Sequence, residues 1–527
     1  MGSDIKVKYT KAKCISTYSE LYGIQINKEQ IIAKIGRLNI NKTLEILKIL
    51  FSTLTTPWYI NFIYVRIKHL DEEKLEDILY SKQTLFYTLK WIMAYSEQIN
   101  AAPMKLNISL EDIVEIIDLQ LMISDYLDKD SIDPTTYIYK NIYFNTQRNS
   151  KNEIVRAYEM YVRLASQNGL YNPKEYVDIN KKFTAKYNIS IKEYIFVIFL
   201  LLSVHLTNFK FKNLNLDELF NGTKNQQRYI TVIKSLGQDI KSYKDWAKQS
   251  IDNSWDYSQI YEYPLIKIKD KEYISLESFT IVNLLFEGLY WKIVDTADSQ
   301  SDRKKIMDFL GKPFEEYVGM ITEEVIKISG LEYTFIPEFK YYVKGEEKKS
   351  SDAYIIKNRT LFIIECKSSR PLRDTFQRED KDNIEKAVRK FCVKPIQQVK
   401  KAFDDICKEK KDMGFDKFED IYIICVSLES VKHTRETIDI MKTELSNDFD
   451  DRIKGYFNLN IEEYEGLCEL LYNALDIKEI LDKYMKNLDD GTFINYIHKE
   501  NEKIINNSWM KLKFEDIVSE IRKTIFK

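Results

Sequence analysis

The chain has 527 residues, of which 44% are hydrophobic and 13% aromatic, with only 15 glycines and 9 prolines. This composition indicates several globular domains and excludes a disordered or fibrous chain. The formal net charge of −2 excludes nucleic-acid binding through overall charge, so such binding would need a local basic surface. The six cysteines show no zinc-ligand spacing, which favours reduced thiols in a cytoplasmic protein.

Residues 1–255 are predicted to form one or two helical domains. Apolar residues recur at steps of three and four in stretches such as 44–54 and 75–92, which is the period of an amphipathic helix. The most apolar stretch, 194–206, has thirteen residues and is shorter than the ~20 needed to cross a bilayer. We therefore expect a buried helix there, with no membrane span and no secretion signal.

Residues 256–310 are predicted to form a connector made of a hairpin and a helix. Apolar and polar residues alternate from 265 to 275, which indicates two strands that turn at 269–271. Helical spacing then returns between 279 and 294.

Residues 311–475 are predicted to form an α/β domain, followed by a helical C-terminal tail at 476–527. The order of helix, three strands, helix and strand predicts a mixed β-sheet flanked by helices. Pro395 should interrupt the second helix. The elements expected here are a helix at 314–329, strands at 332–343, 351–357 and 361–367, a helix at 382–408 and a strand at 421–428. The predicted fold class is therefore α+β multidomain, with a helical N-terminal region.

Two charged side chains end the strongly apolar strand at 361–367. Glu365 and Lys367 should project from the same face, because side chains alternate along a strand. Asp352 opens the preceding strand, and a short loop makes the two strands neighbours, so both carboxylates can meet at one point. Carboxylates in this number suit Mg²⁺, or Mn²⁺, and Lys367 would orient or deprotonate the attacking water in phosphodiester hydrolysis.

An acid-x-Lys pattern is a weak signal by itself, because other places in the chain match it as well. The apolar run before Glu365, and Asp352 on the preceding strand, distinguish this occurrence. A solvated ion pair at the end of a strand remains the alternative. The other matches include Glu72 with Lys74, Glu346 with Lys348, and Glu347 with Lys349.

Asp352 followed by Phe-Ile-Ile-Glu365-Cys-Lys367-Ser-Ser resembles the motif of the PD-(D/E)XK, or restriction-endonuclease-like, nuclease superfamily. Ser351 stands where the motif has its proline. The resemblance implies a restriction-endonuclease-like core, a mixed sheet flanked by helices that covers about 311–470. It also implies divalent-metal-dependent endonuclease activity, a DNA substrate and a role in restriction or anti-phage defence.

Two further residues are candidates through the same resemblance. Many members carry a glutamate on the first core helix, which makes Glu315 a candidate third metal or water ligand, whereas Glu316 should face away. Several branches place a glutamine on the helix after the Glu-x-Lys strand, and Gln398 is the better match of the pair at 397–398. The alternative for Glu315 is an exposed helix glutamate.

A run of basic residues flanks the candidate site and predicts a track for backbone phosphates. The alternative is a solvated helix face. The predicted nucleic-acid contacts are Arg370, Arg373, Lys386, Arg389, Lys390, Lys394, Lys400 and Lys401.

Other functions remain open at this point. The chain has no Gly-rich phosphate loop, so an ATPase or sensing step would come from a partner subunit of a defence system, and a homo-oligomer is compatible with the sequence. The helical region would then recognise a target, sense a trigger or bind that partner. The alternatives to a nuclease are a catalytically inactive nucleic-acid-binding module and an interaction subunit of a larger complex.

Overall fold

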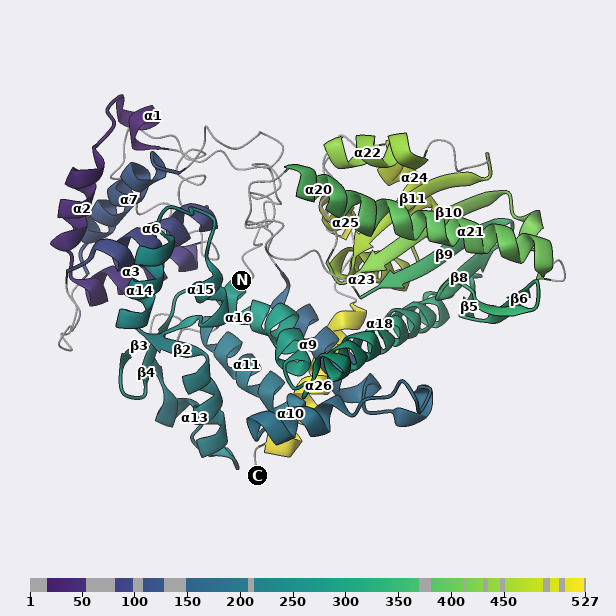
Figure 1. The fold of residues 1–527 in the computed structure, drawn as a ribbon, viewed down its shortest axis with the longest axis horizontal. Helices are drawn as coiled ribbons and strands as arrows, with labels where there is room; N and C mark the ends of the chain where they lie inside the picture. The colour runs from purple at the N-terminus through teal and green to yellow at the C-terminus, as the bar shows by residue number, and fades with distance from the viewer. Residues whose placement is uncertain are drawn as a thin grey trace. The chain divides into compact units, whose positions relative to one another are not determined.

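The chain is an α+β protein with mixed sheets and a helical C-terminal region, described by a computed structural model (Figure 1). The described residues are 17–53, 81–97, 108–127, 148–206, 213–368, 381–410, 413–429, 435–445, 451–486, 493–501 and 508–525.

The chain divides into two compact units that are each discontinuous in sequence. Among the described residues, the sheet unit comprises 154–186 and 293–519, and the helical unit comprises 17–153, 187–292 and 520–525. This division differs from the contiguous ranges predicted from the sequence, because the π-helical turn η1 (Glu159–Leu164) packs on helix α18 (Gln300–Ser329) of the sheet unit.

The sheet unit is built on a five-stranded mixed sheet with the order β11-β10-β9-β8-β5. Strand β10 runs parallel to both β9 and β11, whereas β8 is antiparallel to the central strand β9 and to β5. This confirms the predicted mixed sheet. The strands are β5 (Thr334–Pro337), β8 (Ala353–Lys357), β9 (Thr360–Lys367), β10 (Asp420–Ser427) and β11 (Ile453–Asn460).

Helices cover both faces of this sheet. Gly311 of α18 approaches the end of β9 so closely that an added Cβ would lie 3.2 Å from Ser368 Oγ. Tyr354 of β8 projects from the other face, where its ring meets Phe415, and Phe415 in turn packs against Phe403 of α21. The helices are α20 (Lys381–Val388), π-turn η5 (Arg389–Val393), α21 (Lys394–Glu409), α22 (Arg435–Leu445) and, packed on α18, α23 (Ile461–Tyr472).

Helix α18 is longer than predicted, because it begins at Gln300 rather than near residue 314. The Ser299 side chain accepts a hydrogen bond from the Asp302 backbone N–H and caps the true start. Pro313 lies inside the helix, where the sequence rule expects a helix end. The predicted domain boundary at 310–311 therefore falls within one continuous helix.

Two strands of the sheet unit, at 346–349 and 453–460, escaped prediction because many of their residues are polar. The predicted strand at 332–343 is in fact β5 and β6 (Lys340–Val343), and β6 forms a separate hairpin with β7 (Glu346–Lys349). The edge strand β11 contains lysine, glycine and two asparagines, so its alternation is faint. The break at Pro395 is confirmed, because η5 separates α20 from α21 just before it.

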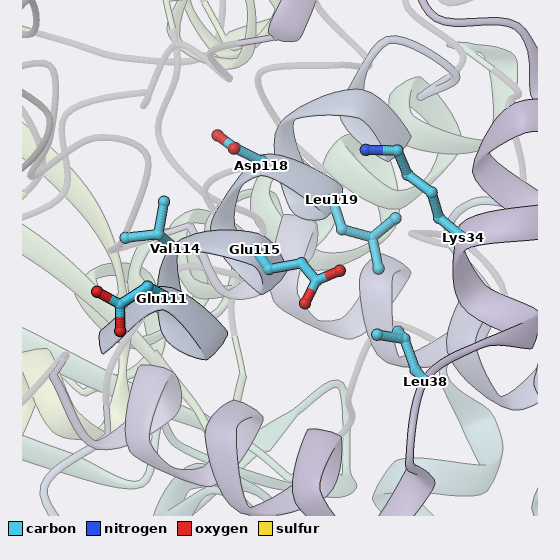
Figure 2. A pocket seen from close by; sticks show the side chains of 7 residues that line it. All are labelled: Lys34, Leu38, Glu111, Val114, Glu115, Asp118 and Leu119. Atoms are coloured by element: carbon cyan, nitrogen blue, oxygen red, sulfur yellow. The ribbon is translucent and has the colours of Figure 1, made fainter. Parts of the chain in front are cut away.

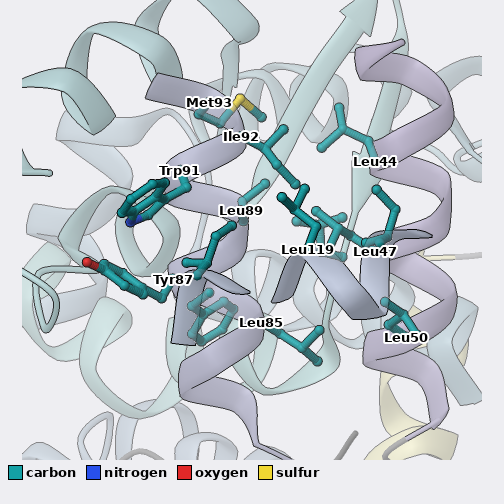
Figure 3. Close-up of a cluster of buried hydrophobic side chains, with 14 of the residues drawn as sticks. Leu44, Leu47, Leu50, Leu85, Tyr87, Leu89, Trp91, Ile92, Met93 and Leu119 are labelled. Atoms are coloured by element: carbon teal, nitrogen blue, oxygen red, sulfur yellow. The ribbon is translucent and has the colours of Figure 1, made fainter. Parts of the chain in front are cut away.

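The helical unit buries its core between α3, α6 and α7. Figure 3 shows Leu44, Leu47 and Leu50 of α3 facing Leu85 and its neighbours on α6, with Leu119 of α7 nearby. Every residue of α6 from Lys82 to Ala94 is buried, so α6 is the central helix of this unit. The helices are α1 (Tyr18–Tyr22), α2 (Lys28–Gly36), α3 (Ile40–Thr53), α6 (Lys82–Tyr95), α7 (Leu110–Ser124), α11 (Ile191–Leu206), α13 (Gln226–Ser235), α14 (Ile240–Ser250) and α16 (Ser278–Asn283).

A small four-stranded sheet accompanies these helices, with the order β1-β4-β3-β2. The predicted hairpin is confirmed as β3 (Leu265–Lys269) and β4 (Glu272–Ser275), and Lys271 in its turn has a positive φ of 58°. The short strands β1 (Leu214–Asn215) and β2 (Gly237–Asp239) escaped prediction.

The predicted buried helix at 194–206 is confirmed as α11, in which Tyr194, Val197 and Leu201 are among the buried residues. In the part of the chain that the structure describes, no single helix is long and apolar enough to cross a membrane. One pair, α10 (Ile179–Tyr187) with α11, meets the length and composition test only jointly and is bent by 67°.

Candidate metal centre

The candidate site begins at the carboxyl end of β9. Glu365 and Lys367 project from the same face, and Lys367 Nζ lies 2.7 Å from Glu365 Oε1. The Glu365 side chain is 16% exposed and that of Lys367 is 32% exposed, so this ion pair is only partly open to solvent. The four preceding residues of β9 are buried, which fixes the strand beneath the two charged groups.

Asp352 lies directly before β8, the antiparallel neighbour of β9. The register pairs Ala353 with Ile364, and its continuation by one residue sets Asp352 opposite Glu365. Side chains of opposed residues share a face of the sheet. The Cys366 backbone N–H donates to Asp352 Oδ2 at 2.6 Å and fixes the orientation of this carboxylate. Both acids therefore lie at the same end of the sheet, close enough for the charge of Glu365 to act on Asp352.

The pKa of the Asp352 carboxyl is governed by burial and, after it, by neighbouring negative charges. Burial, followed by the charges of Glu365 and Glu315, raises the pKa of the Asp352 carboxyl to about 8, against a lowering effect of the Cys366 N–H. A carboxyl in this condition holds its proton near neutral pH unless a cation compensates the charge.

The ammonium of Lys367 responds in the opposite direction. Burial lowers the pKa of Lys367, but the charge and hydrogen bond of Glu365 and the charge of Asp352 outweigh it, so the pKa is raised on balance. Lys367 is therefore a proton donor and a point of positive charge at neutral pH, which argues against its acting as the base that deprotonates water.

Helix α18 brings Glu315 to the same end of the sheet. The absence of a side chain at Gly311 lets α18 approach Ser368, and Glu315 is close enough for its charge to raise the pKa of Asp352. Glu315 is 28% exposed and bonds to Lys312 Nζ at 2.7 Å, whereas Glu316 is exposed. Burial raises the pKa of Glu315, and Lys312 lowers it.

A comparison of Glu315→Gln with Glu316→Gln tests this difference. We expect the Glu315 variant to need about tenfold more Mg²⁺ for half-maximal metal binding, because it removes a carboxylate whose charge acts on Asp352. Glu316→Gln is the matched control and should leave the Mg²⁺ requirement unchanged. Equal effects of the two substitutions in a Mg²⁺ titration would exclude a specific role for Glu315.

The predicted glutamine does not contact the two central carboxylates. Gln398 is exposed on α21, and within the described part of the chain no hydrogen bond joins it to Asp352 or Glu365. The buried side of α21 is formed by Ile396, Val399 and Phe403 instead. A role of Gln398 in the site stays a prediction.

Two members of the predicted basic track, Arg389 and Lys400, are paired with carboxylates in the structure. Arg389 bonds to Glu444 and Glu385, and Lys400 bonds to Asp404 at 2.5 Å. Arg370 and Arg373 lie outside the described residues. The remaining lysines are exposed along one ridge that runs from α20 through η5 to α21, and none forms an ion pair within the described ranges. This lysine ridge consists of Lys386, Lys390, Lys394 and Lys401.

The lysine ridge lies over the face of the sheet that carries Glu365. Asn458 of β11 donates to the Cys392 carbonyl of η5 at 3.4 Å, and Asn458 is the register partner of Cys425, itself the partner of Glu365. The turn η5 therefore contacts the edge strand β11 at the register level of Glu365.

The donor set decides how well a divalent cation fits. Among the described residues no group of three or more His, Cys, Asp and Glu side chains is arranged to hold a metal ion. The opposed carboxylates of Asp352 and Glu365 remain, and Mg²⁺ in proteins is commonly bound by one or two carboxylates with water and substrate oxygens. The raised pKa of Asp352 is the observation that fits a cation at this place.

Three charged residues near the site escaped sequence reasoning. Lys312 pairs with Glu315, and Lys349 Nζ bonds to Glu338 Oε2 at 2.8 Å. The charge of Glu338 raises the pKa of both Asp352 and Glu315, so it belongs to the same electrostatic environment. Glu338 lies between two strands that belong to different sheets, and no spacing in the sequence marks it.

The helical unit has a hollow of its own, of about 300 Å³, between α2 and α7. Figure 2 shows Glu111, Glu115 and Asp118 around it, with Lys34 as its basic side chain. Three acids against one lysine repel phosphate, so this hollow is unsuited to nucleic acid.

Comparisons with known proteins add no assignment: no family model, curated protein or solved structure matches this chain. The functional interpretation therefore depends on the geometry and charge of the residues themselves.

Proposed function

We propose that this protein is a metal-dependent nuclease that hydrolyses phosphodiester bonds, with DNA as its substrate. The observation that carries the proposal is the opposed pair Asp352 and Glu365, with the ammonium of Lys367 beside it and a pKa for Asp352 raised to about 8. Crowded carboxylates next to a lysine suit a cation and a phosphate, whereas a solvated strand end would not raise the pKa of a carboxyl so far.

We also propose that the sheet unit is a restriction-endonuclease-like core. In support, α18, β5, β8, β9, α20–α21 and β10 follow the predicted order of helix, strands, helix and strand, with helices on both faces of a mixed sheet. A role in restriction or anti-phage defence follows from the resemblance of the motif alone.

The chemistry is divided among the residues of the site. A Mg²⁺ or Mn²⁺ ion held by Asp352 and Glu365, with Glu315 nearby, would supply charge neutralisation at the phosphorus and acidify a bound water. Lys367 donates hydrogen bonds to the negative charge that develops on the phosphate oxygens. The Cys366 N–H keeps the Asp352 carboxylate aimed at the site, and Glu365 holds Lys367 in place.

The direct test incubates the full chain with double- and single-stranded DNA, and with RNA, in Mg²⁺ or Mn²⁺. We expect DNA cleavage that EDTA abolishes and added Mg²⁺ restores. Absence of cleavage of all three nucleic acids with both metals would contradict the proposal.

The lysine ridge supplies a second prediction, on binding. We expect combined replacement of Lys386, Lys390 and Lys394 by alanine to weaken DNA binding and to reduce the slope of log K against log salt by about 2 to 3, since each phosphate contact contributes about 0.9. Binding is measured in EDTA, so that cleavage does not interfere. Replacement of the exposed Lys327 and Lys483, which pair with Glu323 and Glu479, is the control. Equal slopes of log K against log salt in the parent, the ridge variant and the control would show that the lysine ridge does not contact DNA.

Two observations favour the second candidate, a catalytically inactive nucleic-acid-binding module. The described residues form no metal group of three ligands, and Lys367 is already paired with Glu365. Salt-sensitive DNA binding without metal-dependent cleavage would support this candidate over the nuclease.

A further inference from the structure

The turn that delivers Asp352 to the site is closed by a tyrosine hydroxyl. Ser351, which is 2% exposed, donates its backbone N–H to the Tyr354 hydroxyl oxygen at 3.1 Å. Tyr354 lies on β8, two residues after Asp352, and is itself 1% exposed. The hydrogen bond therefore spans Asp352 and joins the residue before it to the strand after it.

The other side of this turn is also held. The Phe339 backbone N–H donates to Ser350 Oγ at 2.9 Å, and the Ser350 hydroxyl donates to the Ser351 carbonyl at 2.9 Å. The Phe339 ring packs on the Tyr354 ring with centroids 5.6 Å apart. Packing of Tyr354 against Phe415, at 5.2 Å, fixes its ring from a second direction. Packing on two sides therefore fixes the Tyr354 ring, and with it the position of the hydroxyl that accepts the Ser351 N–H.

Serine at position 351 creates the need for this acceptor. Proline, which the resembling motif has at this position, carries no N–H, whereas Ser351 brings a buried donor into the turn. A buried N–H without a partner costs about 1–3 kcal/mol, so the turn would shift to satisfy it. Tyr354 supplies the acceptor that lets a serine occupy this position.

We propose that Tyr354 is a positioning residue for the candidate metal centre, whose hydroxyl holds the backbone of Ser351 so that Asp352 stays opposite Glu365. This inference rests on the proposed function and deepens it. Tyr354 does not touch the substrate, and its effect passes through Asp352.

The test compares the full-length parent with Tyr354→Phe in two measurements, the Mg²⁺ concentration for half-maximal DNA cleavage and the Kd for Mn²⁺ from electron paramagnetic resonance. We expect Tyr354→Phe to raise both by about tenfold, with a maximal rate at saturating metal within about threefold of the parent. Tyr422→Phe is the control, because Tyr422 is equally buried on β10 and bonds to Asp482 at 2.6 Å. It should lower stability and leave both metal constants unchanged.

A second background separates positioning from general packing. Ser351→Pro removes the N–H, so Tyr354→Phe added to it should change the metal constants by less than about twofold. Equal effects of Tyr354→Phe in both backgrounds, or equal effects of the two tyrosine substitutions, would overturn the inference. If Ser351→Pro fails to fold, the comparison with Tyr422→Phe decides.

The two proposals fail separately. A parent that cleaves DNA, with metal constants that Tyr354→Phe leaves unchanged, would overturn the positioning role and keep the nuclease. A parent that cleaves no nucleic acid, with a Mn²⁺ affinity that depends on Tyr354 as described, would overturn the nuclease and keep the positioning role. A parent that neither cleaves nor binds Mn²⁺ would overturn both.

Discussion

Replacement of Lys367 by alanine is expected to reduce the rate of DNA cleavage by about a thousandfold at saturating Mg²⁺. The ammonium lies 2.7 Å from Glu365, and in the proposed mechanism it donates to the charge that develops on the phosphate, so its loss would act on the transition state. Because the substitution also frees the Glu365 carboxylate, the affinity for Mn²⁺ should be unchanged or higher. Single-turnover cleavage and Mn²⁺ titration measure the two effects.

The control for this substitution is Lys327→Ala, which removes an exposed lysine that is paired with Glu323 near the C-terminal end of α18. It should leave the cleavage rate within about twofold of the parent, as for other exposed pairs. A Lys367→Ala protein that cleaves DNA as fast as the parent would exclude a catalytic role of Lys367. A variant that loses both cleavage and Mn²⁺ binding would show that Lys367 is needed to maintain the metal centre itself.

Replacement of Asp352 by asparagine should abolish metal-dependent cleavage, and it should stabilise the metal-free protein at high pH. The folded pKa of Asp352, about 8, lies above the ordinary value near ~3.9 of an unfolded aspartate. The stability that this group contributes is therefore fully present below about pH 4 and is lost as pH rises to about 8. Asparagine does not titrate and escapes this loss.

Urea unfolding in EDTA measures the difference in the free energy of unfolding. We expect equal stability of parent and Asp352→Asn near pH 4, and an advantage of the variant on the order of 2 kcal/mol at pH 9, after allowance for the partial exposure of the carboxyl. Saturating Mg²⁺ should stabilise the parent and not the variant. A variant less stable than the parent at pH 9 without metal would show that the crowding of charge around Asp352 is not as described.

The strands of the sheet unit that could be predicted are those with strong patterns. The apolar runs of β9 and β10 mark strands buried on both faces, and they also locate the acid and lysine that end β9. The polar β7 and the faint alternation of β11 carry no such mark, because an edge strand or a hairpin depends on its partner rather than on its own residues.

The start of α18 shows how a local rule can fail. Gly311 and Pro313 are residues that end or begin helices in most contexts, and both lie inside this one. The reason for Gly311 is tertiary, since a Cβ at this position would lie 3.2 Å from Ser368 Oγ, closer than an ordinary contact. That approach also brings Glu315 towards Asp352, so the same residue that obscured the helix in the sequence positions a candidate ligand.

The candidate site was predictable only in its strand residues. Alternation along β9 and the adjacency of β8 are enough to expect Asp352, Glu365 and Lys367 at one end of the sheet. Glu338 acts on Asp352 and Glu315 through its charge, from a part of the chain that no spacing marks. Lys312 and Tyr354 make i, i+3 contacts with Glu315 and Ser351, and only the position of those partners in the structure links them to the site. The members of the lysine ridge could not be selected from the sequence alone. Arg389 and Lys400 belong to the same basic run, but the structure shows that each is paired with a carboxylate.

The most direct measurement of the central claim is the position of a bound cation. Crystals of the full-length protein soaked in Mn²⁺ should give an anomalous difference peak between the Asp352 and Glu365 carboxylates, within about 2.5 Å of an oxygen of each. The peak should disappear in Asp352→Asn crystals soaked in the same way. Fully ordered carboxylates with no peak between them, or a peak only at the acidic hollow lined by Glu111, Glu115 and Asp118, would contradict the account.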